Sequence, residues 1–283
     1  MDTTTTSSAH GRHPLVGQLL RDWRGRRRLS QLQLALDTDI STRHLSFIET
    51  GRSRPSGDMI LRIAEQLDVP LRERNRLLLA GGYAPVYRES ALDAPEMSTV
   101  RGALRQILAG HDPYPALIVD RGWNLVDANA GIELFTRGVA EDLLAEPLNV
   151  LRLSLHPEGM APRIVNLGDW RAHLLGRLHR QMVATEDAGL IELYKELSAY
   201  PSVRSHGRTE PEAHPLGAAD VVVPLRYRHG ERELSFFSMT ALFGTPLAVA
   251  IEDLAIESFY PADEATARAL LDLRAEAEGP SAR

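Results

Sequence analysis

The chain has 283 residues, of which 43% are hydrophobic and none is cysteine, so it is long enough for two domains with buried cores. The composition excludes disulfides, thiolate nucleophiles and cysteine-based zinc sites, and no stretch approaches the roughly 18 uninterrupted apolar residues of a membrane span. Residues 1–90 carry 14 arginines, no lysine and 10 acidic residues, a net charge of +4, whereas the remainder carries 18 basic and 28 acidic residues, a net charge of −10. We therefore predict a globular, cytoplasmic protein whose basic N-terminal part contacts a polyanion.

Five short helices are predicted in residues 14–82, after a tail at residues 1–13 that we expect to be disordered. Apolar residues recur there at helical spacing, and Ser30, Ser41 and Ser56 are placed to cap the second, third and fourth helices. The five helices are expected at 15–27, 31–36, 41–50, after Ser56, and at 71–80. The short break at 37–39 indicates a helix-turn-helix, although a plain helical bundle has the same pattern.

The third predicted helix has the composition of a DNA-reading helix. Leu45 and Ile48 form its buried stripe, and another face carries Thr42, Arg43, Ser46 and Phe47. An arginine can chelate O6 and N7 of guanine, and an apolar side chain can pack on a thymine methyl group. Alternatively, Phe47 is half-buried against the preceding helix.

Residues 15–82 resemble the helix-turn-helix domain of the Cro and phage-repressor type. The resemblance rests on the following residues: Gln31, Leu34-Ala35, Ile40-Ser41, Leu45, Ile48-Glu49, Gly51, Arg54-Pro55-Ser56 and Leu61 to Val69. It implies that the helix beginning at Ser41 lies in the major groove of double-stranded DNA. It further implies base contacts from Thr42, Arg43 and Phe47, and phosphate contacts from Gln31, Ser46, Arg52 and Arg54. We also assign Ser41 to this DNA-binding surface.

Two positions in this domain need separate interpretation. The usual glycine of the turn is Asp39 here, and aspartate adopts a left-handed conformation less easily than glycine. Glu49 follows the buried Ile48, and the resemblance makes Arg24 its partner. We expect this pair to orient helices and not to read DNA.

The C-terminal part is predicted to be an α+β domain. A linker and connecting helix at 83–110 precede a domain at 111–275 and a short tail at 276–283. Strands are expected at 116–120 and 123–128, helices at 129–135 and 162–182, and strands at 220–228, 233–243 and 247–259. This order of two strands, helices and a three-stranded antiparallel meander is typical of PAS-like sensor domains.

From Leu15 to Leu273, the chain is similar to the MmyB-like family of bacterial regulators. The resemblance rests on the element order, on the repressor-type domain in front, and on two stretches: Trp123-Asn124-Leu125-Val126-Asp127-Ala128-Asn129-Ala130 and "HPEGMAPRIVNLGDWRAHLLGRL" at 156–178. It implies a PAS-like domain able to hold a fatty acid.

A stripe of polar and aromatic residues indicates where such a ligand binds. If a helix begins at Pro162, one narrow stripe runs beside its apolar face, comprising Arg163, Asn166, Trp170, His173 and Arg177. Arginine binds carboxylates strongly, so this stripe suits an amphiphile whose tail enters the core. Alternatively, the stripe packs against the sheet or a second subunit.

The sequence favours a DNA-binding regulator over an enzyme. It lacks a phosphate-binding loop, a nucleophile elbow, GxGxxG and HExxH, and its histidines are scattered, so we expect no catalytic residues, no metal site and no required cofactor. We predict a homodimer that binds a near-palindromic operator, acts as a repressor and senses an apolar or fatty-acid-like effector. The alternative is a C-terminal domain that serves only for dimerisation or protein docking.

Overall fold

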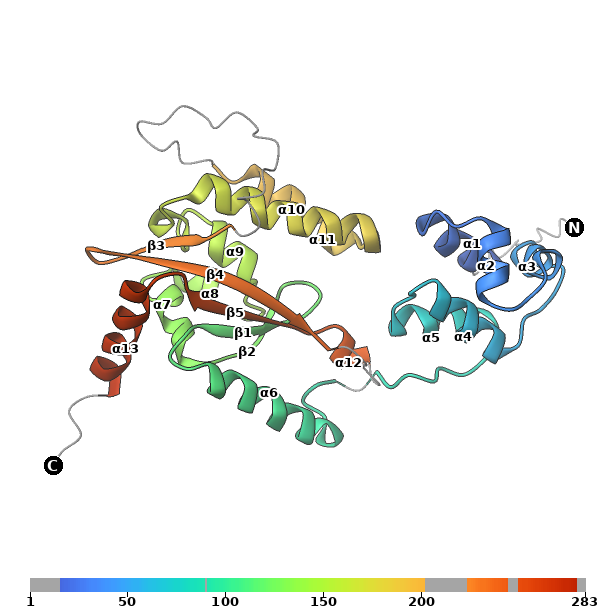
Figure 1. The fold of residues 1–283 in the computed structure, drawn as a ribbon, viewed down its shortest axis with the longest axis horizontal. Coiled ribbons are helices and arrows are strands. Elements are labelled where there is room, and N and C mark those ends of the chain that lie inside the picture. Colours follow the sequence, from blue (N-terminus) through green and yellow to red (C-terminus); the bar gives the residue numbers. More distant parts are fainter. Residues whose placement is uncertain (1–15, 90, 202–222, 244–248, 279–283) are drawn as a thin grey trace, which may run out of the picture. The chain divides into compact units, whose positions relative to one another are not determined.

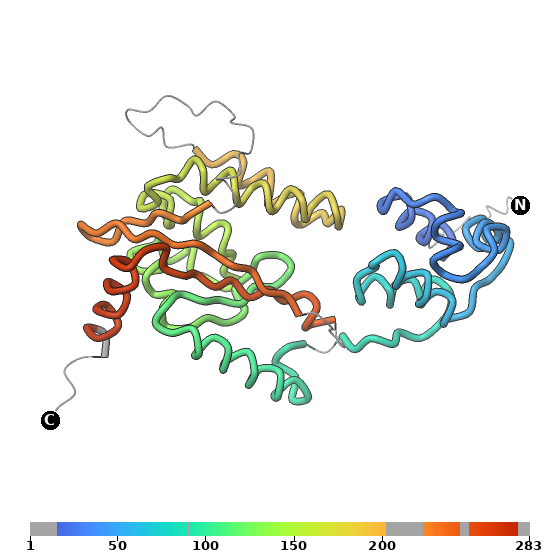
Figure 2. The backbone as a smooth tube through the Cα atoms, in the orientation of Figure 1, coloured from blue at the N-terminus to red at the C-terminus, as the bar shows by residue number. Residues whose placement is uncertain are grey.

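The structure, a computed structural model, describes residues 16–89, 91–201, 223–243 and 249–278 (Figure 1). The tail predicted at residues 1–13 lies outside this part of the chain. The molecule divides into an N-terminal unit, Met1–Ala91 with Thr245–Glu252, and a C-terminal unit, Leu92–Gly244 with Asp253–Arg283. The tube in Figure 2 follows the chain through each unit.

The five predicted N-terminal helices are all present, and serine side chains begin three of them. Ser30, Ser41 and Ser56 accept hydrogen bonds from the backbone N–H groups of Gln33, His44 and Met59, as N-cap residues do. The helices are α1 (Val16–Arg26), α2 (Gln31–Asp37), α3 (Thr42–Glu49), α4 (Gly57–Gln66) and α5 (Leu71–Ala80).

One core holds these helices together and fixes the position of α3. Its fully buried side chains include Leu20, Leu34, Leu45, Ile48, Ile60 and Ile63. α1 and α3 approach closely at Gly17, where a β-carbon would lie 2.0 Å from the carbonyl oxygen of Ile48. Gly17 is therefore required for this helix contact.

A short helix from far along the sequence completes the N-terminal unit. α12 (Val249–Glu252) lies where a strand was predicted at 247–259, so that prediction is wrong over these residues. Glu252 Oε2 accepts a hydrogen bond of 2.7 Å from Leu71 N, and Val249 N donates one of 3.0 Å to Arg88 O. Because Pro70 gives α5 no side-chain cap, Glu252 supplies the missing acceptor at the start of this helix.

The C-terminal unit is built on a five-stranded antiparallel sheet with the order β2-β1-β5-β4-β3. The strands are β1 (Ala116–Val119), β2 (Leu125–Ala128), β3 (Leu225–His229), β4 (Arg232–Leu242) and β5 (Ala255–Pro261). The α-helices are α6 (Ser98–His111), α7 (Glu133–Thr136), α8 (Glu141–Leu144), α9 (Val150–Leu155), α10 (Leu167–Thr185), α11 (Ala188–Ala199) and α13 (Glu264–Glu278). The predicted order of two strands, helices and three further strands is present, and the chain is an α+β protein.

Helices cover both faces of this sheet (Figure 1). Leu117, Phe236 and Phe259 point into the main core, which they share with residues of α9, α10 and α11. Ile118 and Ile256 alternate with them and pack on the other face against α6. The main core therefore lies between the sheet and the helices from the middle of the chain.

The helix predicted at 162–182 begins at Leu167, so its predicted start is wrong. Pro162 and Arg163 belong to the 3₁₀ turn η3 (Ala161–Arg163). Ile164 then forms a β-bridge with Tyr227, and Val165 N donates a hydrogen bond of 2.8 Å to Arg226 O. This extended pairing with β3 separates Arg163 from α10.

Other boundaries also differ from the predictions. β3 begins at Leu225, whereas residues 220–222 of the predicted strand lie outside the described part of the chain. α11 was not predicted, and α13 continues to Glu278, into the segment predicted as a tail.

Candidate functional site

The exposed side of α3 carries a phenylalanine between two arginines. Phe47 is half-buried. The guanidinium carbon of Arg43 lies 5.4 Å from the centroid of its ring, and that of Arg52 lies 6.0 Å away. Arg43 and Arg52 are exposed and Thr42 and Ser46 are half-buried, so this side of α3 offers two cations, an aromatic ring and two hydroxyl groups.

Glu49 holds α1, α2 and α3 together, as expected for this position. Arg24 Nε and Nη2 donate hydrogen bonds of 2.7 and 3.0 Å to its two carboxylate oxygens, which confirms the predicted pair. Gln31 Nε2 donates a further hydrogen bond of 2.7 Å to Glu49 Oε2. The hydrogen bond to Glu49 raises the pKa of Arg24. Gln31, predicted to contact phosphate, therefore uses its amide N–H inside the protein.

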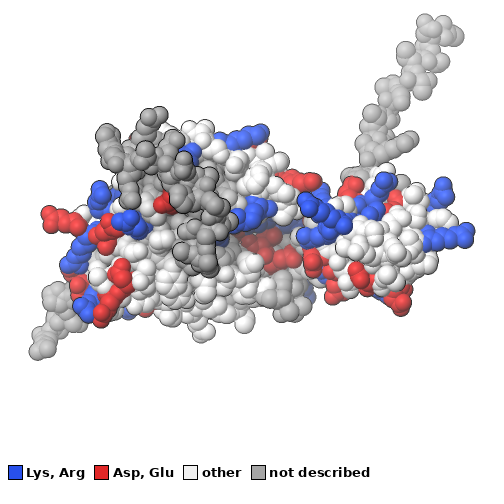
Figure 3. Space-filling model, turned by 45° about the horizontal axis from the view of Figure 1, so that its top comes forward, with Lys and Arg blue, Asp and Glu red and all other residues white. Residues whose placement is uncertain are grey.

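The remaining predicted DNA contacts lie at the ends of α3. Ser41 caps the helix through its hydroxyl oxygen. Arg54 Nη2 donates a hydrogen bond of 2.9 Å to Gly81 O, and its guanidinium carbon lies 5.7 Å from the ring centroid of Tyr83. In the view of Figure 3, basic side chains of this unit lie mostly along its upper side and acidic ones mostly along its lower edge.

The turn between α2 and α3 has the left-handed backbone that the sequence made questionable. Asp39 has φ +53°, and its N–H donates a hydrogen bond of 3.3 Å to Leu36 O. Aspartate is among the few residues other than glycine that adopt this conformation, at some energetic cost. The helix-turn-helix geometry is thus kept without the usual glycine.

The second site is a pocket between the sheet and the helices of the C-terminal unit. It encloses about 640 Å³ of space outside the protein atoms, part of it open to solvent. Most of its lining is apolar: Leu117, Trp123, Leu125, Ile132, Phe135, Leu148, Val150, Leu151, Leu153, Met160, Trp170, Leu174, Leu225 and Phe259. An apolar lining with a few polar groups is typical of small-molecule pockets.

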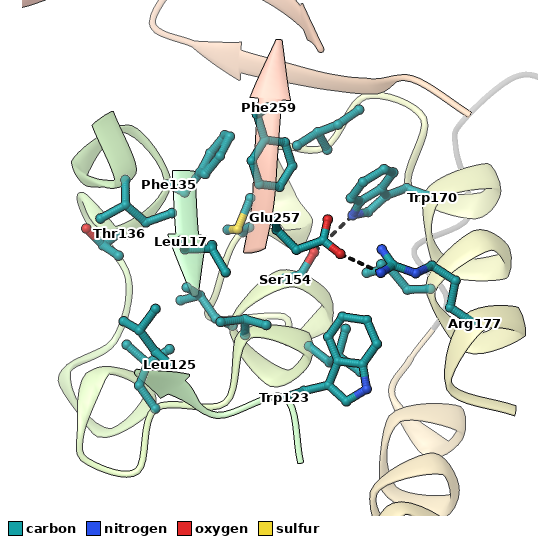
Figure 4. Close-up of a pocket in the computed structure, with 18 residues that line it drawn as sticks. Leu117, Trp123, Leu125, Phe135, Thr136, Ser154, Trp170, Arg177, Glu257 and Phe259 are labelled. Carbon is teal, nitrogen blue, oxygen red and sulfur yellow. Dashed lines mark hydrogen bonds and ion pairs between the residues drawn. The ribbon is translucent and has the colours of Figure 1, made fainter. Parts of the chain in front are cut away.

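The two charged groups of the pocket lie on one side of it, near Ser154, whereas Thr136 lies on the opposite side (Figure 4). Arg177 of α10 reaches Glu257 of β5 and forms an ion pair in which Nη2 is the donor. The same Nη2 donates a hydrogen bond of 2.8 Å to Thr240 Oγ1, which in turn donates one of 2.8 Å to Glu257 Oε1. The guanidinium carbon of Arg177 lies 4.8 Å from the ring centroid of Trp123. Leu117, Leu125 and Phe135 lie toward the opposite side of the pocket.

Only two residues of the predicted ligand-binding stripe line this pocket, Trp170 and Arg177. Trp170 is buried and donates a hydrogen bond of 3.0 Å from Nε1 to Ser154 Oγ. Arg163 is directed elsewhere, because its Nη1 donates to Arg137 O and its guanidinium stacks on Tyr227. Asn166 Nδ2 donates a hydrogen bond to Pro224 O, and Asn166 Oδ1 accepts one from Arg226 N.

His173 does not line the pocket. Its ring stacks on Trp170, with centroids 5.5 Å apart and an angle of 22° between the planes. Burial lowers the pKa of His173, and the nearby positive charge of Arg177 lowers it further. The side chain is therefore neutral near pH 7 and does not provide a cation for an anionic ligand.

Sequence reasoning missed Glu257 and Thr240, the partners of Arg177. A single glutamate within the apolar strand 255–261, two residues from the inward-facing Phe259, was the available signal. Recognising it required the register of β5, in which Glu257 pairs with Leu117 on one side and Thr240 on the other. That register depends on strands far apart in the sequence.

No cluster of three His, Asp or Glu side chains able to hold a metal ion occurs among the described residues. In that part of the chain, no helix combines the length and the apolarity that crossing a membrane requires.

Comparison with known protein families assigns both units. Residues 20–74 match the helix-turn-helix family, and residues 100–273 match the family described as MmyB-like transcription regulator ligand binding domain. No curated protein matches the sequence. The second match covers more than half of the chain and contains every residue of the pocket. The chain therefore belongs to the MmyB-like transcription regulators, in which a helix-turn-helix DNA-binding domain is joined to a ligand-binding domain.

Proposed function

We propose that this regulator binds a near-palindromic operator as a homodimer, represses transcription from it in the cytoplasm, and responds to an apolar or fatty-acid-like effector. The observation that carries the proposal is the pocket of the ligand-binding domain, apolar on one side and polar at Arg177 and Glu257 on the other. An amphiphile with a long apolar chain and one polar head has the matching distribution of polarity.

The DNA side of the proposal rests on α3. We expect Arg43 and Phe47, which lie together on the exposed side of α3, to meet base edges, and Ser46 and Arg52 to meet phosphates. Ser41, Thr42, Gln31 and Arg54 complete the proposed interface. Gln31 offers DNA the second N–H of its side-chain amide, and Arg54 offers the exposed part of its side chain. One such helix per chain reads one half-site.

Dimerisation is proposed because two half-sites roughly 34 Å apart require two recognition helices in fixed geometry. The C-terminal unit carries exposed apolar side chains on the face of β4 that points away from the pocket. Phe237 and Met239 are 39% and 50% exposed, and Phe237 stacks on Tyr260 at 5.2 Å. Apolar side chains grouped on one face of a sheet are suited to contact with a second protein surface.

That same face supports the second candidate function, in which the C-terminal unit is only a dimerisation or docking module. The two functions differ in one measurable respect, because only the sensor binds a small molecule in its pocket. Purified protein should be denatured and extracted, and the extract analysed by mass spectrometry for a stoichiometric small molecule.

Binding should also be followed by tryptophan fluorescence. The chain has three tryptophans, and two of them, Trp123 and Trp170, line the pocket. In a Trp23→Phe variant, emission arises from these two alone, so pocket binding is expected to change it. If long-chain amphiphiles leave the emission unchanged and calorimetry of the stripped protein detects no heat, the sensor function is refuted and the module function remains.

A further inference from the structure

We propose that the pocket selects a ligand with a neutral head group that both donates and accepts hydrogen bonds, such as an alcohol or a primary amide, and disfavours a carboxylate anion. This inference rests on the proposed sensor function and specifies the chemical class of its effector. It follows from the way the charges at the polar side of the pocket are already paired.

The positive charge of Arg177 is neutralised inside the protein. Its partner Glu257 is held on the central strand β5, with Thr240 directly across on β4 and bonded to both side chains. The side chains are largely withdrawn from water, with exposures of 19% for Arg177 and 6% for Glu257. A carboxylate ligand at Arg177 would therefore lie close to a second buried carboxylate, and like charges in such a place repel strongly.

Both a hydrogen-bond acceptor and hydrogen-bond donors of Arg177 and Glu257 remain unused within the described part of the chain. Among the described residues, Glu257 Oε2 accepts no hydrogen bond, and Arg177 Nε and Nη1 donate none. A ligand head is therefore offered one acceptor and several donors side by side. A hydroxyl or a primary amide has both a donor and an acceptor, whereas an ionised carboxylate has acceptors alone and cannot satisfy Glu257.

The rest of the pocket does not alter this preference. Trp170 Nε1 is already bonded to Ser154 Oγ, and the aromatic ring of Trp123 lies under Arg177. The opposite side, around Leu117, Leu125 and Phe135, is apolar apart from Thr136 and suits the hydrocarbon chain (Figure 4). Chain length sets affinity there, and the head group sets selectivity at Glu257.

The test compares a 1-alkanol, a primary alkanamide and an alkanoate of the same chain length, titrated by calorimetry into stripped full-length protein near neutral pH. We expect the alkanol and the amide to bind about tenfold or more tightly than the alkanoate. In Glu257→Gln, which keeps the shape but removes the negative charge, the alkanoate should gain affinity, so that the preference disappears or reverses.

A matched control is available in the same sheet. Arg226 and Glu233 form an ion pair whose side chains are more than 40% exposed, away from the pocket. Glu233→Gln should leave the selectivity unchanged. Circular dichroism establishes that each variant is folded before its affinities are compared.

The possible outcomes distinguish failure of the neutral-head inference from failure of the proposed sensor function. If none of the three compounds binds wild-type protein, the proposed sensor function fails. If the alkanoate binds as tightly as the alkanol, the sensor function stands and the neutral-head inference is overturned. It is also overturned if Glu257→Gln folds normally and keeps the wild-type preference.

Discussion

At the scale of single residues, the account depends on arginines whose surroundings differ. Arg24 is bound to Glu49 within the helical core, Arg43 is exposed beside Phe47, and Arg177 is paired with Glu257 in the pocket. Of these three, Arg43 is the one that presents its charge to the solvent on the face that is expected to meet DNA. The same residue type thus orients helices, reads DNA or shapes a ligand site, according to its partners.

Arg43 and Arg52 should affect DNA binding in different ways. Arg43→Ala is expected to weaken binding to the operator by about 1–3 kcal/mol and to change binding to random DNA little, because base contacts discriminate sequence. Arg52→Ala should weaken both and lower the slope of log K against log salt by roughly one unit. Fluorescence anisotropy at several salt concentrations measures both effects.

Arg76→Ala, at an exposed pair with Glu73 on α5, is the control. Equal losses on both DNAs for Arg43→Ala would refute its role in reading bases.

His173 should make the protein less stable in mild acid. Its pKa is lowered in the folded protein, so below its ordinary pKa of about 6.5 the unfolded chain binds the proton more readily. Its stabilising contribution is therefore complete above that pH and is lost as the pH falls through the lower folded pKa. His229 also has a lowered pKa and acts in the same direction. The test compares two proteins, the His229→Gln variant and the double variant His173→Gln/His229→Gln. Between about pH 7 and about pH 5, the free energy of unfolding in urea should fall less in the double variant. An equal loss in the two proteins would contradict this interpretation.

At the scale of elements, the boundary of a helix or strand can be predicted when the residues that determine it are close together in the sequence. The serines at 30, 41 and 56 cap helices through hydrogen bonds to residues three positions away, so the starts of these helices could be predicted. The start of α10 could not, because Ile164 and Val165 pair with β3, about sixty residues later in the chain. The same non-local pairing removed Arg163 and Asn166 from the predicted stripe, and the unrecognised register of β5 concealed Glu257.

The turn between α2 and α3 offers a test of local strain. Asp39→Gly should stabilise the N-terminal unit by about 0.5–1 kcal/mol, because glycine adopts the positive φ of this position without steric cost. Asp37→Gly, two residues earlier and at the helical end of α2, should instead destabilise it by about 0.5–1 kcal/mol. Thermal unfolding followed by circular dichroism distinguishes the two variants. A loss of stability in Asp39→Gly equal to that in Asp37→Gly would show that the turn carries no such strain.

At the scale of the whole molecule, the chain connects its two units more than once. The sequence predicted one connection, through the linker and helix at 83–110, and α6 indeed packs on the sheet of the C-terminal unit. The structure adds α12, which belongs to the N-terminal unit yet lies in sequence between β4 and β5. Thr240 of β4 and Glu257 of β5 belong to the polar cluster of the pocket. Leu242, at the end of β4, pairs with Ala255, at the start of β5, next to the segment that contains α12. A change at the pocket strands therefore has a covalent route to the helix that abuts α5.

Glu252 is the residue through which this route should act. In Glu252→Ala, the effector is expected to bind isolated protein as in wild type, but its effect on operator affinity should shrink toward none, because the carboxylate no longer bonds Leu71 N. Calorimetry measures the first quantity and anisotropy the second. Glu231→Ala, in the exposed turn between β3 and β4, should retain the full effect. An undiminished effect in folded Glu252→Ala would exclude α12 as the coupling element.

The central claim is that occupation of the pocket changes the affinity for DNA. Operator affinity should therefore be measured for one preparation of the full-length protein before and after its bound small molecule is removed, with removal verified by mass spectrometry. Coupling free energies between two sites are typically about 1–3 kcal/mol, so the two dissociation constants should differ by roughly 5-fold to 150-fold. Restoring the extracted molecule should restore the first value. Identical dissociation constants for the occupied and the emptied protein would contradict the account.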